Sequence, residues 1–484
     1  MLLFVGCGYI ILRVYIKRCD VAVKAKKTTL MTEGNIIKQL LIFSLPLLAG
    51  NLFQQLYNTV DTYVVGNYVS HEAFAAVGSI GPVVNTLVGF FSGLATGAGV
   101  VVSQYFGAGN KEKVRSTVNT AMLLTAALSI LFTILGVVCS PYALKLMNTN
   151  ADTFDLANEY LTIYFAGISG LMFYNMGAGV LRAIGDSTKP FVLLVISAVI
   201  NTVLDLVFVL VFNMGVAGVA YATIIAQFVS AIVVLVMLLT TKECYGIKIC
   251  KNMFDMHVFK NILRVGMPAA LQMAVTAFSN IFVQAYINAF DTHVMAGWTA
   301  YNKIDMFAML PMTSISLAST TFVGQNLGVG NVERAKKGTK TAMLMAMSLT
   351  VACIIPIMLF ADPLIMFFDP TPDMLPYGRH ILLLLSPFYL LCCFNQIYAG
   401  SLRGAGDSKA PMFIMLGSFV VFRQIYLAVC TALTAASAEM TALTVTVLSY
   451  PAGWLVCSLV MFFYYHHSNW EKKSIVKSNI TQNA

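Results

Sequence analysis

The chain alternates long apolar stretches with short polar segments over most of its length. A helix that crosses a lipid bilayer needs about 20 mostly apolar residues, and this criterion predicts twelve spans. They cover residues 36–66, 73–104, 115–140, 156–181, 188–212, 215–240, 258–288, 293–324, 336–361, 375–402, 409–436 and 439–465. The pattern predicts an all-α integral membrane protein with twelve transmembrane helices.

Charged residues in the loops support this count, because basic and acidic loops alternate. Loops after even-numbered spans are basic, and hold Lys111, Lys113, Arg115, Arg182, Lys189, Lys242, Lys248, Lys251, Lys260, Arg334, Lys336, Lys337, Lys340, Arg403 and Lys409. Loops after odd-numbered spans are mainly acidic, with Lys145 and Arg379 as exceptions. Since Lys and Arg concentrate in cytoplasmic loops, we expect both termini in the cytoplasm and the protein in the inner or plasma membrane.

Composition narrows the function classes further. Hydrophobic residues make up 58% of the chain and charged residues 11%, against about 25% charged in soluble domains. The net charge of +9 follows the loops and forms no separate basic patch, so no nucleic-acid partner is expected. The sequence has no phosphate-binding loop of the ATPase type, no catalytic cluster and no Cys-x-x-Cys pair. We therefore expect neither an enzyme nor a cofactor, and a protein that acts as a monomer.

The two halves of the chain repeat the same motifs at one constant offset. Residues 102–110 (Val-Ser-Gln-Tyr-Phe-Gly-Ala-Gly-Asn) match 323–331, and residues 179–187 (Gly-Val-Leu-Arg-Ala-Ile-Gly-Asp-Ser) match 400–408. Each half contains six spans, so the two repeats have the same orientation in the membrane. Parallel repeats of this kind occur in transporters, with the substrate site between them.

The repeat predicts how the chain is divided. The segments are an N-terminal extension outside the fold (1–30), an N-lobe with spans 1–6 (31–240), a cytoplasmic linker (241–257), a C-lobe with spans 7–12 (258–466) and a cytoplasmic tail (467–484).

Ionisable residues inside a membrane are costly and mark functional sites. Two carboxylates, Asp61 and Asp205, lie deep within the N-lobe spans. Helical spacing places each with polar neighbours, and the candidate cluster is Gln54, Tyr57, Asp61, Asn201, Asp205 and Thr223. Counted at 1.5 Å per residue, Asp61, Asp205 and Thr223 all lie roughly 9–12 Å below the outer end of their spans.

A site of this composition suits cation coupling. A buried carboxylate can bind a proton near neutral pH and release it elsewhere. Oxygen atoms of Asp61, Asn201, Asp205 and Thr223 are equally able to hold Na⁺. The alternative interpretation is that these polar groups only join helices within the lobe.

The C-lobe holds three further charges at mid-span depth. Lys303 and Asp305 are two residues apart and point to different sides of their helix, whereas Asp305 and Arg423 are placed to form an ion pair between spans 8 and 11. A structural ion pair and a substrate-facing role are both open. Met306 and Met309 are candidates for an adaptable cavity wall, although ordinary helix packing also explains them.

The duplicated Gln-x-x-Gly-x-Gly ends and Leu-Arg-x-x-Gly-Asp loops, with Leu56-Tyr-Asn-Thr-Val-Asp-Thr62, resemble the prokaryotic branch of the multidrug and toxic compound extrusion (MATE) family over residues 31–466. The resemblance implies two six-helix lobes in a V-shaped arrangement. It also implies export of small organic, often cationic, compounds in exchange for H⁺ or Na⁺. The cluster from Gln54 to Thr223 is similar to the family's N-lobe cation site. A lipid-linked saccharide flippase is the alternative, but it would be expected to have more than two cationic residues in its cavity.

Overall fold

The computed structural model describes residues 30–147, 149–248, 253–368, 371–434 and 437–476. Side chains of a few residues within helices, Tyr57 and Asp61 among them, also lie outside what it describes. The predicted N-terminal extension, residues 1–30, falls outside the described residues except for Leu30.

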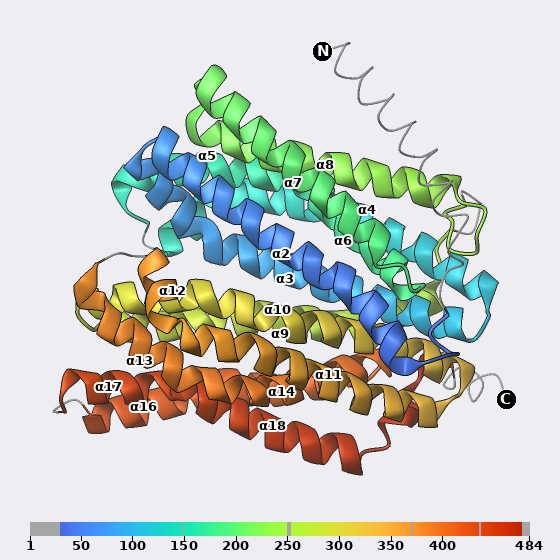
Figure 1. The fold of residues 1–484 in the computed structure, drawn as a ribbon. Coiled ribbons are helices and arrows are strands. Elements are labelled where there is room, and N and C mark those ends of the chain that lie inside the picture. The colour runs from blue at the N-terminus through green and yellow to red at the C-terminus, as the bar shows by residue number, and fades with distance from the viewer. Residues whose placement is uncertain (1–29, 148, 249–252, 369–370, 435–436, 477–484) are drawn as a thin grey trace.

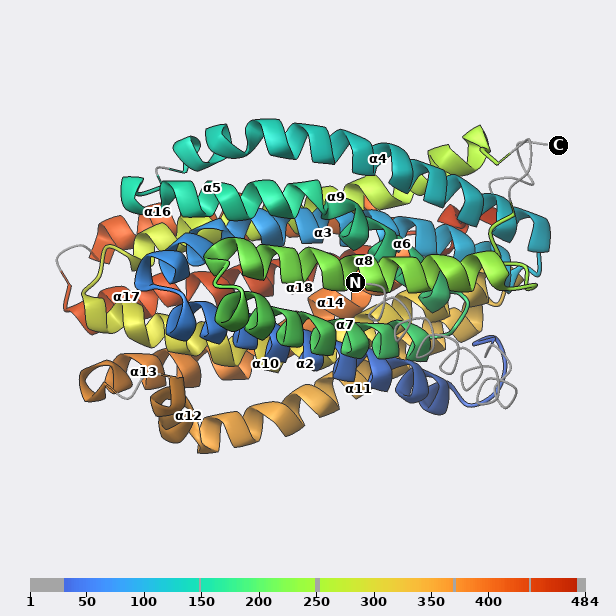
Figure 2. The ribbon, with the colours of Figure 1, turned by 90° about the horizontal axis from the view of Figure 1, so that it is seen from above.

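Helices make up both lobes, and the N-lobe forms one layer above the C-lobe in Figure 1. Its elements are α2 (Ile36–Tyr68), α3 (His71–Gly107), α4 (Lys111–Leu146), α5 (Ala151–Ala166), α6 (Ile168–Ala183), α7 (Thr188–Leu206), the π-helix η1 (Val207–Val211) and α8 (Gly215–Thr240). The helices run nearly side by side, and the view from above in Figure 2 shows α4, α5 and α8 along the outer face of this layer.

The C-lobe contains more breaks. Its elements are α9 (Met256–Ile287), α10 (Thr292–Val329), α11 (Val332–Leu359), α12 (Ala361–Phe368), η2 (Pro372–Met374), α13 (Leu375–Leu385), η3 (Ser386–Phe388), α14 (Tyr389–Gly404), α15 (Lys409–Leu416), η4 (Gly417–Phe422), α16 (Arg423–Thr434), α17 (Glu439–Val447), α18 (Ser449–His467) and η5 (Trp470–Lys473).

Among the described residues, eleven helical stretches are long and apolar enough to cross a membrane. The remaining predicted span, the fourth (156–181), is present as two helices, α5 and α6, separated by a turn at Gly167. A Cβ at Gly167 would lie 2.5 Å from the Ile224 side chain of α8, so the glycine lets α8 approach the break. The corresponding C-lobe span is broken at Ser386–Phe388, where Pro387 interrupts the helix.

Side-chain caps and glycines set the helix ends that the sequence repeat marks. Asn110 and Asn331, which occupy equivalent positions of the repeat, accept hydrogen bonds from the backbone amides of Lys113 and Arg334 and so cap α4 and α11. Gly330 has φ of +87° and ends α10 in the left-handed conformation, which a side chain would strain. We call the end of the bundle at which α3 and α10 finish the basic end, because Lys111, Arg334 and their neighbours lie there.

The lobes touch along α3 of the N-lobe and α9 and α10 of the C-lobe. Glycines make the approach possible: a Cβ at Gly97 would lie 2.1 Å from the backbone of Gly266, and one at Gly93 would lie 2.4 Å from that of Ala270. Both contacts belong to the half of α3 nearer the basic end. The lobes are therefore in backbone contact on that side.

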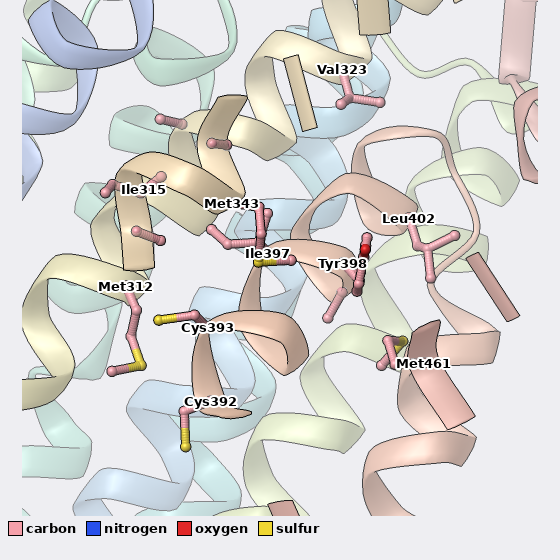
Figure 3. Packing of buried hydrophobic residues seen from close by; sticks show 14 of the residues in the cluster. Met312, Ile315, Val323, Met343, Cys392, Cys393, Ile397, Tyr398, Leu402 and Met461 are labelled. Carbon is pink, nitrogen blue, oxygen red and sulfur yellow. The ribbon is translucent and has the colours of Figure 1, made fainter. Parts of the chain in front are cut away.

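The apolar core of each lobe extends across the contact between the lobes, since the C-lobe core includes Phe43 of α2 and the N-lobe core includes Ile262 of α9. In the C-lobe, α10, α11, α14 and α18 pack around buried residues that include Met312, Met343, Cys393, Tyr398 and Met461, and Figure 3 shows these side chains converging between the helices. The cysteines in this core, such as Cys393, are free thiols and pack as small apolar side chains. This packing fixes the helix orientations that carry the polar groups described next.

Candidate transport site

Three polar residues of the predicted N-lobe cluster are buried inside that lobe. Asn201 and Asp205 belong to α7 and are 2% and 0% exposed, and Thr223 of α8 is 9% exposed. Helix α2, which carries the rest of the cluster, packs against both α7 and α8. Asp205 lies just before η1, and π-helical turns within α-helices are frequent at functional sites.

The side-chain amide of Asn201 indicates most clearly that this cluster could bind a ligand. Neither its nitrogen nor its oxygen has a hydrogen-bond partner among the described residues, although both atoms are buried. Leaving a buried polar group unsatisfied costs about 1–3 kcal/mol. The Thr223 hydroxyl, in contrast, donates to the backbone oxygen of Val219 at 3.0 Å. Its oxygen retains lone pairs that can accept a hydrogen bond or coordinate a cation.

The α2 members of the cluster divide between two places. The backbones of Tyr57 and Asp61 belong to α2, and their side chains lie outside the described residues. Gln54 lines a cavity between the lobes. The sequence had grouped Gln54 with the carboxylates of its own lobe, but the structure places it opposite the C-lobe.

This cavity has a volume of about 380 Å³ and lies between α2 and α10. Its lining residues are Asn51, Gln54, Gln55, Asp305, Met306, Met309, Leu310 and Thr313. At its edge, Asn51 of α2 donates to the Ser314 hydroxyl of α10 at 3.2 Å, a bond that joins the two lobes. Asp305 supplies the one carboxylate of the lining, and neither Lys nor Arg belongs to it.

Two tyrosines hold the Asp305 carboxylate in place. The Tyr301 hydroxyl donates to Oδ1 of Asp305 at 3.2 Å, and Tyr389 donates to the same oxygen. The two hydroxyls also lie 3.1 Å apart. Tyr301 is 2% exposed and Tyr389 is fully buried, so both rings support the carboxylate from the C-lobe side. An acceptor fixed in this way can pair with a positively charged group in the cavity without reorganising.

The expected ion pair between Asp305 and Arg423 is absent from this structure. Arg423 donates from Nη2 to the Ser279 hydroxyl and to Oδ1 of Asn280, each at 2.9 Å. Its guanidinium also stacks over the Tyr450 ring, 4.8 Å from the centroid. The π-helix η4 immediately precedes Arg423, and a π turn changes the direction in which later side chains point.

Of the other C-lobe candidates, Met306 and Met309 line the cavity. Lys303 is exposed and does not belong to the lining, which agrees with the prediction that it points away from Asp305. Arg423 is 3% exposed and buried within the C-lobe. The structure therefore does not place Lys303 or Arg423 at the substrate cavity, where the sequence had made them candidates.

Several lining residues were not anticipated from the sequence. Asn51 lies about one helical turn before Gln54, and Gln55 directly follows it. Thr313 follows Met309 by four residues. Polar residues at this spacing within α2 were a usable signal. Tyr301 lies four residues before Asp305 and was equally accessible, whereas Tyr389 comes from α14 and required the tertiary structure.

Comparisons with known proteins match the chain to one family over both lobes. The family model MatE matches residues 46–207 and again 268–430, one match in each lobe. The probable multidrug resistance protein YpnP of Bacillus subtilis is 30% identical over 91% of this chain and 97% of its own length. The probable multidrug resistance protein NorM of Thermotoga maritima is 27% identical over 78% of this chain and 82% of its own.

A solved outward-facing structure of a multidrug resistance MATE family transporter superposes on this chain with a TM-score of 0.84 at 24% identity, and covers 91% of this chain and 98% of its own. This match confirms the expected all-α architecture of two lobes. With a family model that matches both lobes and relatives aligned over nearly the whole length, the chain belongs to the MATE family of membrane transporters, as its duplicated motifs predicted.

Proposed function

We propose that this protein exports small organic cations in exchange for H⁺ or Na⁺ by alternating access. The observation that carries the proposal is the cavity between the lobes, which is lined by one fixed carboxylate, two methionines and four uncharged polar residues. Its volume of about 380 Å³ falls in the range of small-molecule sites, about 300–1,000 Å³.

The lining favours an organic cation of variable shape. Asp305 offers a single negative charge, and the Met306 and Met309 side chains are flexible and polarisable, so they adapt to different apolar groups. No lining residue is basic, so a phosphate-bearing lipid would meet no countercharge. This argues against a saccharide-lipid flippase, which the relatives' names do not favour either.

Coupling is assigned in this proposal to the N-lobe cluster. The side chains of Asp205, Asn201 and Thr223 are buried. Helix α2, which carries Asp61, packs against the two helices that hold them. A cation bound there would satisfy the Asn201 amide oxygen, and it would be exchanged when the lobes change the side that they open to. Whether the site binds H⁺ or Na⁺ depends on how many oxygen atoms, those of the two carboxylates included, can coordinate one cation. The basic end is taken as cytoplasmic from its Lys and Arg content.

A vesicle assay tests the proposed export. In everted membrane vesicles that contain the protein, a fluorescent organic cation is expected to accumulate when a gradient of H⁺ or of Na⁺ is imposed, and to leak out when that gradient is collapsed. Each ion gradient is imposed separately, with the other ion equal on both sides. Accumulation that is the same in vesicles without the protein would contradict the proposal.

A further inference from the structure

Two buried glutamines at the basic end, Gln104 and Gln325, occupy equivalent positions of the sequence repeat. Both are fully buried. Nε2 of Gln104 donates to the backbone oxygen of Gly404 at 2.8 Å, and Nε2 of Gln325 donates to that of Ala183 at 2.8 Å. Each glutamine therefore reaches across to the opposite lobe, and the two acceptors are themselves equivalent positions of the repeat.

The oxygen of each glutamine side chain binds an end of the described chain. Oε1 of Gln325 accepts from the backbone amide of Met31 at 2.8 Å. Oε1 of Gln104 accepts from the Ser474 hydroxyl at 3.0 Å and from the Ile475 amide at 2.8 Å. The segment that leads into the first helix is thus bound to the C-lobe, and the segment that follows the last helix is bound to the N-lobe.

The N-terminal segment is anchored by more than this one bond. Met31 is 1% exposed and packs into the C-lobe core. Asn326 donates to its backbone oxygen at 3.1 Å. Arg334, at the start of α11, donates to the backbone oxygens of Glu33 and Gly34 at 3.0 and 2.9 Å. One C-lobe arginine therefore fixes several carbonyls of a segment that continues into the N-lobe helix α2.

The C-terminal segment crosses in the opposite direction. Trp470 is 1% exposed and stacks on Tyr465 in the C-lobe core, with ring centroids 4.9 Å apart. Lys473 forms an ion pair with Asp407 at 2.8 Å. Burial disfavours the charged form of Lys473, but its hydrogen bonds to Asp407 and Tyr464 prevail and raise its pKa. Two residues later, Ile475 is 1% exposed in the N-lobe core.

A small void lies between the lobes near the two glutamines. It has a volume of about 20 Å³ and is lined by residues of α3, α6 and α10 such as Thr96, Arg182 and Thr320. That volume is close to what one water molecule needs, so this void is too small for an organic cation.

We propose that residues 30–35 and 470–476 are two straps that, through Gln325 and Gln104, lock the lobes together at the basic end, and that both must release before the cavity opens on that side. The lock is symmetric, because each glutamine bonds at the same time to the opposite lobe and to one strap. The role of this lock in transport rests on the transport cycle proposed above, whereas the contacts that form the lock do not.

Opening is measured directly as a distance between the lobes. Nitroxide labels on Lys111→Cys in the N-lobe and Lys340→Cys in the C-lobe, both exposed and outside the straps, are placed in a background with the native cysteines replaced. Pulsed dipolar spectroscopy of the purified full chain, without substrate, then reports the distance distribution at the basic end.

Two variants break the lock by different routes. Gln104→Met with Gln325→Met keeps the side-chain volume but removes all five hydrogen bonds of the two side chains. Ile475→Asp places a charge in the N-lobe core and expels the C-terminal strap. Each is expected to raise the population of the longer distance at least about tenfold, because each variant loses two or more of these buried hydrogen bonds. The control Lys337→Gln changes an exposed residue at the same end and should leave the distribution unchanged.

Unchanged distances in both folded variants would overturn the proposal. If the glutamine variant does not fold, the strap variant decides alone, because residue 475 lies beyond α18. If the distances respond but the protein exports no organic cation, the straps stand and the proposed substrate falls.

Discussion

Replacing Asp205 with Asn is expected to abolish gradient-driven export while the protein still folds and binds substrate. The side chain keeps its size, but it can no longer change charge or balance a bound cation. Asp205 is fully buried next to the π-helical turn of α7 and η1, so no nearby solvent compensates for the change. Asp61→Asn is expected to have the same effect. Export by purified protein in proteoliposomes under an imposed gradient is the measurement, and it should fall to the level of liposomes without protein.

A matched control comes from the same lobe. Thr223→Ala removes one neutral hydroxyl that already bonds to Val219 within its own helix, and should weaken coupling only partly. If the Asp61→Asn, Asp205→Asn double variant exported at the wild-type rate under the gradient, coupling would have to lie outside the N-lobe.

Replacing Asp305 with Asn should weaken binding of an organic cation by about 10- to 100-fold. Hydrogen bonds and contacts that involve a charged group contribute about 1.5–3 kcal/mol, and each 1.4 kcal/mol is a factor of ten in Kd. Asn preserves the shape and can still accept from Tyr301 and Tyr389, which hold the carboxylate now. The loss therefore reports the charge. Kd is measured by fluorescence titration of the purified protein.

Lys303→Gln is the control for this experiment. Lys303 lies two residues from Asp305 on the same helix but is exposed and does not line the cavity, so its loss should leave Kd unchanged. Equal affinity of the wild type and the Asp305→Asn variant would remove Asp305 from the substrate site.

Sequence patterns predicted the membrane spans, the repeat and the family, because apolar length and duplicated motifs are local properties of the chain. They did not predict the turn at Gly167, where the apolar run continues without a charge or proline and the break depends on close packing with α8. The equivalent C-lobe break contains Pro387 and was visible in principle.

Side-chain partners were hard to predict. Asp305 and Arg423 were expected at similar depth, yet each bonds to other groups, because helix rotation after η4 decides which neighbours Arg423 meets. Gln54 shares a helix with Asp61 but lines the cavity opposite Asp305. The strap contacts of Gln104 and Gln325 join segments from opposite ends of the chain. Such contacts cannot be deduced from spacing along one helix.

The two proposed sites are linked by the requirement that coupling cation and substrate favour opposite-facing states. A ligand shifts a conformational equilibrium only through its different affinity for the two states, and the effect of one ligand on another is reciprocal. A cation bound near Asp205 and an organic cation bound near Asp305 should therefore each promote release of the other.

Reciprocal exchange in proteoliposomes measures this coupling between the two cations. Liposomes with purified protein are loaded with an organic cation, with no gradient of H⁺ or Na⁺ imposed, and the internal concentration of each ion is followed with a dye. Downhill efflux of the organic cation is predicted to drive one of these ions inward and so to build up a gradient of that ion, and the Asp61→Asn, Asp205→Asn double variant should abolish that uptake. Efflux of the organic cation with no inward movement of either ion would contradict the account.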